Sequence, residues 1–224
     1  MARVGIIGDT HCPAMLRRYP AFLSRTFERW GVDTIVHIGD LVDWHAINFH
    51  GKHADAPGVK DEVRKARRQV QNLYQRFPEA TWIIGNHDDL PARRADAIGL
   101  PSDAIVNPVE YWEVHDWSLV ERFGYIEIDG VLYSHGEIGS QGLYAAINQA
   151  KAETASVAIG HLHGNAGVSW VANKARRLFG LSVGCGVDWR VLAMKYGRKF
   201  GKKPLIGCGI VIDGSYATWE PMAL

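Results

Sequence analysis

Five short apolar runs in this chain each end beside residues that can bind a metal ion. The runs lie at residues 4–7, 34–38, 81–84, 131–133 and 157–159. Apolar runs of this length are typical of buried strands. Because a strand delivers its last side chain to one end of its sheet, five strand ends can converge on one spot, where open α/β sheets bind ligands. The pattern therefore restricts the chain to a layered α/β protein with a site at the carboxyl ends of its strands.

Aspartate, histidine and asparagine gather in the segments that follow these runs. The segments are Gly8-Asp9-Thr10-His11, Gly39-Asp40-Leu41-Val42-Asp43, Gly85-Asn86-His87-Asp88, Ser134-His135-Gly136 and Gly160-His161-Leu162-His163-Gly164. Asp9 and His11 stand two residues apart, so a strand that opens into a loop can turn both toward one ion. His161 and His163 repeat that spacing. Asp40 is suited to bridge two ions, because the two oxygens of a carboxylate can each hold a cation.

The predicted donors are imidazole nitrogens and carboxylate or amide oxygens, with no thiolate. Such a set suits transition-metal ions better than Ca²⁺ or a structural zinc. We therefore predict two divalent ions, with Mn²⁺ expected and Fe, Zn or Ni as alternatives. Two ions roughly 3.5–4 Å apart can activate a water and neutralise a phosphoryl group together.

Helical patterns separate the early strands. Residues 20–30 predict one helix, bounded by a proline and a glycine. Residues 60–77 predict the clearest helix, since their apolar side chains fall on one face and Pro78 follows. A further helix is predicted over residues 140–153. The β-α-β order predicts right-handed crossovers between parallel strands.

Hairpins come later in the chain. Asp129-Gly130 separates residues 125–128 from 131–133, and Asp213-Gly214 separates 206–212 from 215–219. An Asp-Gly pair between apolar runs is a strong signal for a two-residue hairpin turn. Parallel strands early and hairpins late predict two sheets.

The segment 44–58 is rich in histidine and irregular, so it predicts a long loop. Trp44 is expected to line the pocket of the site, because it follows Asp43 directly. For His45, His50 and His53 the favoured interpretation is solvated loop histidines, and substrate contact is the alternative.

Two basic runs are open to two interpretations. Residues 64–68 fall on the predicted second helix and are expected to form a solvated face. Residues 195–203 mix lysine and arginine with aromatic residues, and such a mixture can track a phosphate backbone. A solvated tail is favoured for them, since the net charge shows no bias. The segment 90–116, broken by prolines, predicts short helices and loops over the site.

The bulk properties restrict the class of protein. At 224 residues the chain suits one domain, and we expect residues 1–224 to form it. A net charge of +1 argues against a protein that coats nucleic acid, without excluding a nuclease. Cys12, Cys185 and Cys208 lie far apart and predict neither a disulfide framework nor a zinc knuckle, so a cytoplasmic location is expected. We also expect neither a membrane span nor a signal peptide.

The order of the five motifs resembles that of the calcineurin-like metallophosphoesterases, from Gly8 to Gly164. Residues 36–50 and 183–188 also look similar to phage-encoded members. The resemblance implies a four-layer α/β/β/α sandwich of two mixed sheets, with a binuclear metal site at the carboxyl ends of the strands. The ligands it implies are Asp9, His11 and His163 for the first metal, Asn86, His135 and His161 for the second, and Asp40 as the bridge.

The resemblance also implies catalytic roles for two residues that bind no metal. His87 would contact the phosphate and protonate the leaving group. Asp43 would hydrogen-bond His87 and fix its tautomer. Protein phosphatases of this superfamily carry Arg-Gly after the second motif and glutamate after Gly-Asn-His. Here Trp44-His45 and Asp88 stand in those places, which argues against phosphoprotein substrates.

These features predict a metal-dependent hydrolase of phosphoric esters that uses a hydroxide activated by two metals. A phosphodiesterase or nuclease is expected, with a nucleic acid or nucleotide as partner. The alternative is a phosphomonoesterase acting on nucleotides or small phosphoesters. A metal-binding scaffold without catalysis is less favoured, because His87, His135, His161 and His163 are all present. The sequence carries no signal for an oligomeric state.

Overall fold

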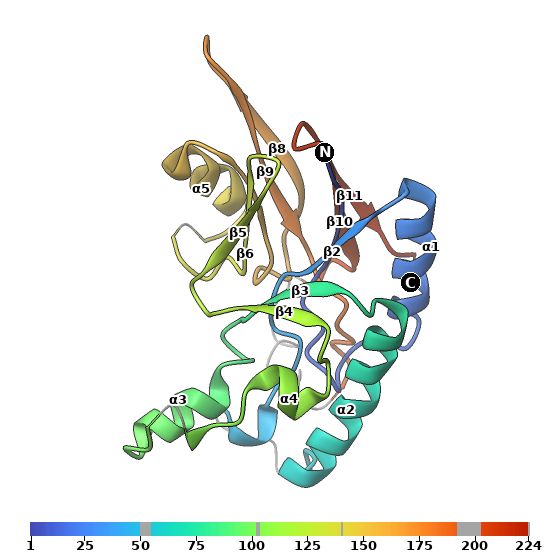
Figure 1. The fold of residues 1–224 in the computed structure, drawn as a ribbon, viewed down its shortest axis with the longest axis vertical. Helices are drawn as coiled ribbons and strands as arrows, with labels where there is room; N and C mark the ends of the chain where they lie inside the picture. The colour runs from blue at the N-terminus through green and yellow to red at the C-terminus, as the bar shows by residue number, and fades with distance from the viewer. Residues whose placement is uncertain (50–54, 102–103, 140, 192–202, 224) are drawn as a thin grey trace.

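Two β-sheets lie face to face in the computed structural model, and helices cover the outer face of each (Figure 1). The structure describes residues 1–49, 55–101, 104–139, 141–191 and 203–223. Both sheets contain parallel and antiparallel neighbours. The predicted four-layer α/β/β/α sandwich of two mixed sheets is therefore confirmed. That residues 1–224 form a single domain stays a prediction.

The first sheet has six strands in the order β11-β10-β1-β2-β3-β4. Their bounds are β1 (Arg3–Ile7), β2 (Thr34–His37), β3 (Ala80–Ile83), β4 (Trp117–Val120), β10 (Gly207–Ile212) and β11 (Tyr216–Pro221). Strands β1 to β4 run parallel, while β10 and β11 form the predicted hairpin and pair antiparallel with β1. The edge strand β4 was not predicted.

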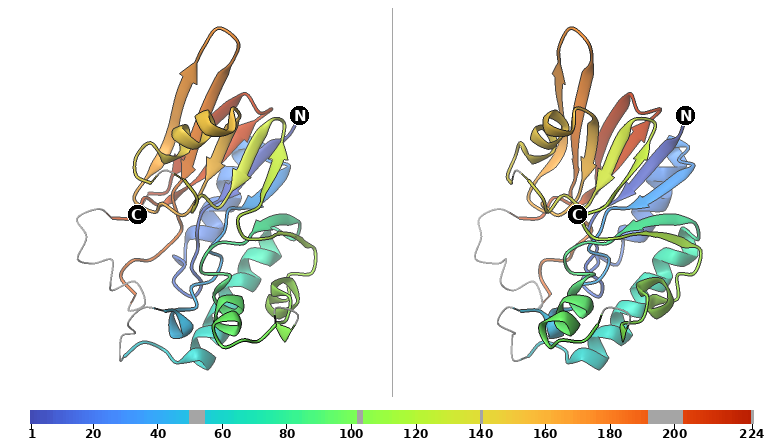
Figure 2. Two further views of the ribbon diagram at one scale, coloured as in Figure 1. Left: turned by 90° about the vertical axis from the view of Figure 1, so that its left-hand side faces the viewer. Right: turned by 60° about the vertical axis from the view of Figure 1, so that its left-hand side comes forward.

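The second sheet has five strands in the order β5-β6-β7-β9-β8. Their bounds are β5 (Tyr125–Ile128), β6 (Val131–Ser134), β7 (Ser156–Ile159), β8 (Ala166–Ala172) and β9 (Arg177–Val183). The predicted hairpin β5–β6 lies at one edge. The hairpin β8–β9, which was not predicted, lies at the other edge and extends beyond the rest of the molecule (Figure 2).

The helices follow the predicted order. They are α1 (Tyr19–Trp30), α2 (Val59–Arg76), α3 (Leu90–Ala97), α4 (Pro108–Trp112) and α5 (Ala145–Glu153), with a short 3₁₀ helix η1 (His45–Ile47). Helix α5 begins at Ala145 rather than at the predicted residue 140, because Gly142 adopts a left-handed φ of 87° just before it. No helix among the described residues is both long enough and apolar enough to cross a membrane.

Neighbouring residues on the central strands bury their side chains on opposite faces, which explains the unbroken apolar runs. Ile6 packs between the two sheets, whereas Ile7 packs under the helices of the first sheet. Likewise, Ile83 packs between the two sheets and Trp82 packs under the helices of the first sheet. The core between the sheets consists of Val4, Ile6, Val36, Ile38, Ile83, Val131, Tyr133, Ala158, Phe179, Leu181, Val183, Val211 and Ala217. This core fixes the strand ends of one sheet against those of the other.

Helix α5 packs tightly against the second sheet at Gly180. A Cβ atom there would overlap the backbone of Ala146 and Ile147. We predict that Gly180→Ala lowers the free energy of unfolding by about 1–3 kcal/mol, because the added methyl group must displace the helix. Urea denaturation would measure the change. Gly58→Ala, with no atom within 4 Å of the added carbon, is the control, and an equal loss in both variants would contradict the prediction.

Candidate metal centre

The structure brings all of the predicted site residues together at the carboxyl ends of five strands. Those of the first sheet follow β1, β2 and β3, and those of the second sheet follow β6 and β7. Among the described residues, three groups could hold an ion, and within each group the potential ligand atoms lie within 4.8 Å of one another. The groups are Asp9, His11 and His163; His11, Asp40 and His87; and Asp40, His135 and His161.

The first group joins the loop after β1 to the loop after β7. The Nε2 atom of His163 lies 3.0 Å from Asp9 Oδ2 and 3.2 Å from His11 Nε2. The backbone N–H of His161 donates to both oxygens of Asp9, at 3.2 and 3.0 Å. Each sheet thus contributes to this group, which is the set that the family resemblance implies for the first metal.

Asp40 lies between the first group and the two histidines of the third, His135 and His161. Its Oδ2 atom is 3.4 Å from His11 Nε2 and 3.4 Å from His135 Nε2. The amide oxygen of Asn86 lies 3.1 Å from the same His135 nitrogen. This central place is the one expected of a bridging carboxylate.

Hydrogen bonds orient two of the imidazole rings toward the centre. The Nδ1 atom of His135 donates to the carbonyl oxygen of Ile38 at 3.0 Å, and that of His11 donates to Asp43 Oδ1 at 2.9 Å. In each ring this leaves Nε2 facing the other site residues. Tying the outer ring nitrogen in this way fixes the tautomer that binds a metal.

The donor set fits divalent cations. Asp9 and Asp40 are fully or almost fully buried, with 0% and 2% of their surface exposed. Burying two carboxylates at one place is costly unless positive charge compensates them. The nitrogens that face them come from histidine, a common ligand of Mn, Fe, Zn and Ni ions. Two ions at this place would supply the missing charge.

Two glycines let the loops close around the carboxylates. A Cβ atom at Gly85 would overlap Asp40 Oδ1, and one at Gly160 would overlap Asp9 Oδ1. His11, Asp40 and His161 themselves adopt left-handed backbone conformations, with φ of 44°, 49° and 64°. Such conformations are unfavourable for residues other than glycine and cluster at functional sites.

Comparison with known proteins identifies the family. The family model of the calcineurin-like phosphoesterases matches residues 2–184. The chain belongs to that family. The resemblance that the motifs predicted is therefore confirmed at the family level, and the likeness to phage-encoded members stays a prediction.

Two solved structures are similar to this calcineurin-like phosphoesterase. One is YfcE, a phosphoesterase from E. coli, with 13% identity and a TM-score of 0.45 over 93% of this chain and 87% of that chain. The other is vacuolar protein sorting 29 from Cryptosporidium parvum, with 12% identity and a TM-score of 0.46 over 100% of this chain and 98% of that chain. No curated protein sequence matches the chain.

The charges of this calcineurin-like site stabilise one another. Burial alone would raise the pKa of Asp40, but the positive charges of His135 and His87 and the hydrogen bonds of His11 and His135 hold it well below its usual value. Burial alone would lower the pKa of His135, but Asp40 and Asp9 raise it to about 10. The pKa of His11 is likewise raised, despite burial, by Asp40 and Asp43. Without a metal, these carboxylates therefore favour the protonated forms of His135 and His11.

Asp43 contacts His87, as predicted, but it also contacts His11. Its carboxylate accepts from His11 Nδ1 at 2.9 Å and lies 3.2 Å from His87 Nδ1. The hydrogen bond from His87 Nδ1, at 2.8 Å, goes to the backbone carbonyl oxygen of Asp43. The tautomer of His87 is thus fixed by the main chain, while the Asp43 carboxylate orients His11.

The prediction of a solvated His45 is wrong. Only 7% of His45 is exposed, because the buried Glu62 of α2 accepts the backbone N–H groups of His45 and Ala46 at 2.6 and 2.8 Å. His50 and His53 lie outside the described residues. No local sequence pattern predicts these hydrogen bonds of Glu62, because an acidic residue in the first turn of a helix is common.

Asp88 is a second buried carboxylate that the motifs did not assign. It accepts from the backbone N–H groups of Val42 and Gly85, each at 3.0 Å, and from Trp82 Nε1 at 3.1 Å. These bonds tie the loop after β2 to the loop after β3. Asp88 therefore supports the placement of Asp40 and Asn86, which lie on those loops.

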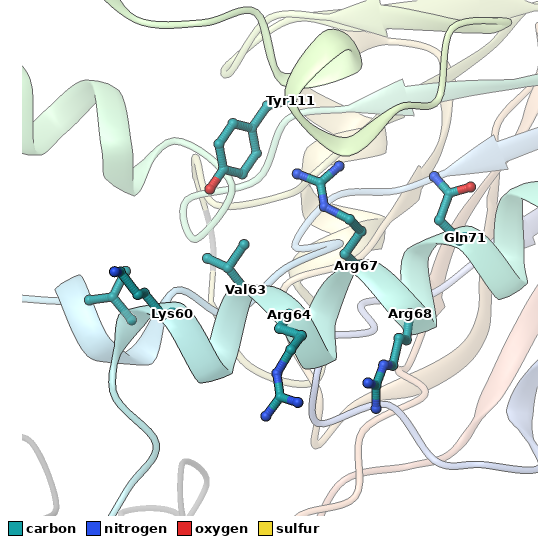
Figure 3. Close-up of a pocket in the computed structure, with 8 residues that line it drawn as sticks. Lys60, Val63, Arg64, Arg67, Arg68, Gln71 and Tyr111 are labelled. Atoms are coloured by element: carbon teal, nitrogen blue, oxygen red, sulfur yellow. The ribbon is translucent and has the colours of Figure 1, made fainter.

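The predicted basic face of α2 is only partly solvated. Arg64 and Arg68 point away from α4, whereas Arg67 turns toward Tyr111 (Figure 3). Arg67 Nη1 lies 2.7 Å from Glu113 Oε1, and the guanidinium lies over the Tyr111 ring at 5.4 Å. Arg64, Lys65 and Arg68 are exposed, as predicted, whereas Arg67 is half-buried against α4, with 30% of its side chain exposed. The second basic run, 195–203, lies almost entirely outside the described residues.

Trp44 lines a hollow, while its predicted place in the pocket of the metal site stays a prediction. The hollow has a volume of about 640 Å³ and is walled by Trp44, Tyr111 and Trp112 together with residues of α3 and of the segment before α4. None of the predicted metal ligands lines it. The hollow therefore lies beside the centre and not at it.

Metal affinity should rise with pH. His135 and His11 must lose their protons to bind an ion, and the pKa of His135 in the metal-free protein is raised from 6.5 to about 10. Affinity should increase by up to about tenfold per pH unit for each proton released. Calorimetric titration with Mn²⁺ at pH 6, 7 and 8 would measure it. An affinity independent of pH would contradict the protonated state of these histidines.

Proposed function

We propose that this calcineurin-like protein hydrolyses phosphoric diesters with the help of two divalent ions, of which Mn²⁺ is expected. The observation that carries the proposal is the place of Asp40, 3.4 Å from one histidine of each ligand group. A carboxylate between two groups of imidazole and oxygen donors is the arrangement that a two-metal site needs. Membership of a phosphoesterase family supports the same chemistry.

The proposed ligands of each ion are those that the family resemblance implies. They are Asp9, His11 and His163 for the first ion, Asn86, His135 and His161 for the second, and Asp40 for both. When bound, two such ions neutralise phosphoryl charge and lower the pKa of the attacking water. The residues of the chain would hold the ions, and hydrogen bonds already fix the rings of His11 and His135 for that role.

His87 is the proposed general acid. Burial alone would lower its pKa, but the charge of Asp40 and the contact with Asp43 raise it. A raised pKa keeps the ring protonated near neutral pH, as protonation of a leaving oxygen requires. Its Nδ1 atom donates to the Asp43 carbonyl oxygen, so Nε2 is free to reach substrate. About a fifth of the side chain is exposed, at 22%.

The charge of the site favours a diester. The five motif segments contain no lysine or arginine. A phosphomonoester dianion carries one more negative charge than a diester, and sites that bind it commonly supply arginine. Since these five segments supply no lysine or arginine, a singly charged diester is the better match to their histidines and the two proposed ions. We therefore propose a nucleic acid or a nucleotide diester as substrate.

The proposal predicts that Asp40→Ala abolishes turnover while the fold persists, because both ions lose their shared ligand. The assay compares metal-stripped protein reloaded with Mn²⁺ on bis-p-nitrophenyl phosphate, p-nitrophenyl phosphate and a labelled single-stranded DNA oligomer. Asp61→Ala, at an exposed aspartate on α2, is the matched control. Activity on the monoester alone would replace the diesterase by a monoesterase. Normal activity of folded Asp40→Ala would refute the metal mechanism.

His87→Ala should separate catalysis from metal binding. We expect kcat to fall on the order of 10²–10⁴-fold, as for loss of a general acid. The number of bound Mn²⁺ ions should not change. His115→Ala, at an exposed histidine, controls for loss of an imidazole elsewhere. If His87→Ala loses an ion instead, His87 is a ligand and not the acid.

A further inference from the structure

We propose that Arg122 is a positioning residue for the second metal. It clamps two ligand loops, one from each sheet, to the segment that crosses between the sheets. The inference rests on the proposed two-metal function. Arg122 lies outside all five motifs, in the segment between β4 and β5.

Arg122 lies where the chain passes from one sheet to the other. Strand β4, at the edge of the first sheet, ends at Val120, and β5, at the edge of the second sheet, begins at Tyr125 (Figure 1). A side chain on this crossover can reach loops of both sheets.

The guanidinium of Arg122 makes three short contacts. Its Nη1 atom lies 2.9 Å from Asp89 Oδ2. Its Nε and Nη2 atoms donate to the two carboxylate oxygens of Glu137, at 2.8 and 2.7 Å. Such a two-bond fork is the strong, directional form of an ion pair. Lysine cannot reproduce it, because an ammonium group lacks the planar fork.

The two acids belong to the loops that carry ligands of the second metal. Asp89 stands three residues after Asn86, on the loop that follows β3. Glu137 stands two residues after His135, on the loop that follows β6. These strands belong to different sheets, yet Asn86 Oδ1 lies 3.1 Å from His135 Nε2. Arg122 therefore spans the same gap that the second metal must span.

The network is shielded enough to hold its geometry. The side chains of Arg122, Asp89 and Glu137 are 18%, 25% and 12% exposed. Ion pairs at this depth are screened less by salt than surface pairs. The two loops that Arg122 joins, after β3 and after β6, carry Asn86 and His135 and no proposed ligand of the first ion. Loss of Arg122 should thus loosen the second ion alone.

The test counts and titrates bound Mn²⁺ by electron paramagnetic resonance and calorimetry in Arg122→Gln. We expect the affinity of one ion to fall about 10–100-fold, as for loss of a group that orients metal ligands. The other ion should bind as in the wild type. Arg122→Lys should resemble Arg122→Gln, because the fork is lost in both. Arg29→Gln, which removes the 2.6 Å pair with Glu220 between α1 and β11, should leave both ions unchanged.

Other results would overturn the inference. Unchanged affinities in Arg122→Gln, or an equal loss for both ions, would show that the network only stabilises the fold. If Arg122→Gln does not fold, Glu137→Gln keeps the Asp89 pair and should weaken the same ion by a smaller factor. No effect in folded Glu137→Gln would refute the clamp. A wild type that binds fewer than two ions would instead refute the proposed function, so the two failures are distinguishable.

Discussion

The structure of this site depends on the burial of two carboxylates, Asp9 and Asp40, at the junction of the two sheets. An isolated buried carboxylate is strongly unfavourable. Here histidines surround both, and backbone N–H groups from other loops donate to them: His161 to Asp9 and His87 to Asp40. Each carboxylate is thereby stabilised by a strand end other than its own. The loops cannot be rearranged singly, because each one completes the surroundings of another.

The loops approach the two carboxylates so closely that glycine is required at two neighbouring positions. Gly85 and Gly160 stand where any side chain would overlap a carboxylate oxygen. His11, Asp40 and His161 adopt left-handed backbone conformations just after their strands. Conformations of this kind persist only where the surrounding structure imposes them. The two packed sheets and their shared apolar core supply that rigidity.

Acidic residues outside the motifs organise the loops that carry the ligands. Asp88 ties the loop after β2 to the loop after β3, and Glu62 fixes the segment that follows Asp43. Asp89 and Glu137 meet at Arg122, on the crossover between the sheets. The site is therefore surrounded by ion pairs and hydrogen bonds that join distant parts of the chain. This outer layer holds the donors at fixed separations, on which metal affinity depends.

The sequence alone determined the strands that carry the site and the side chains that follow them. Both are local: an apolar run buried on both faces, a glycine and a donor need only neighbouring residues to be recognised. The tertiary structure decided the rest. The edge strand β4, the β8–β9 hairpin, the burial of His45, the sharing of Asp43 between two histidines and the Arg122 clamp all depend on partners far away in the chain. No local pattern encodes such contacts, since packing selects them only once the two sheets have met.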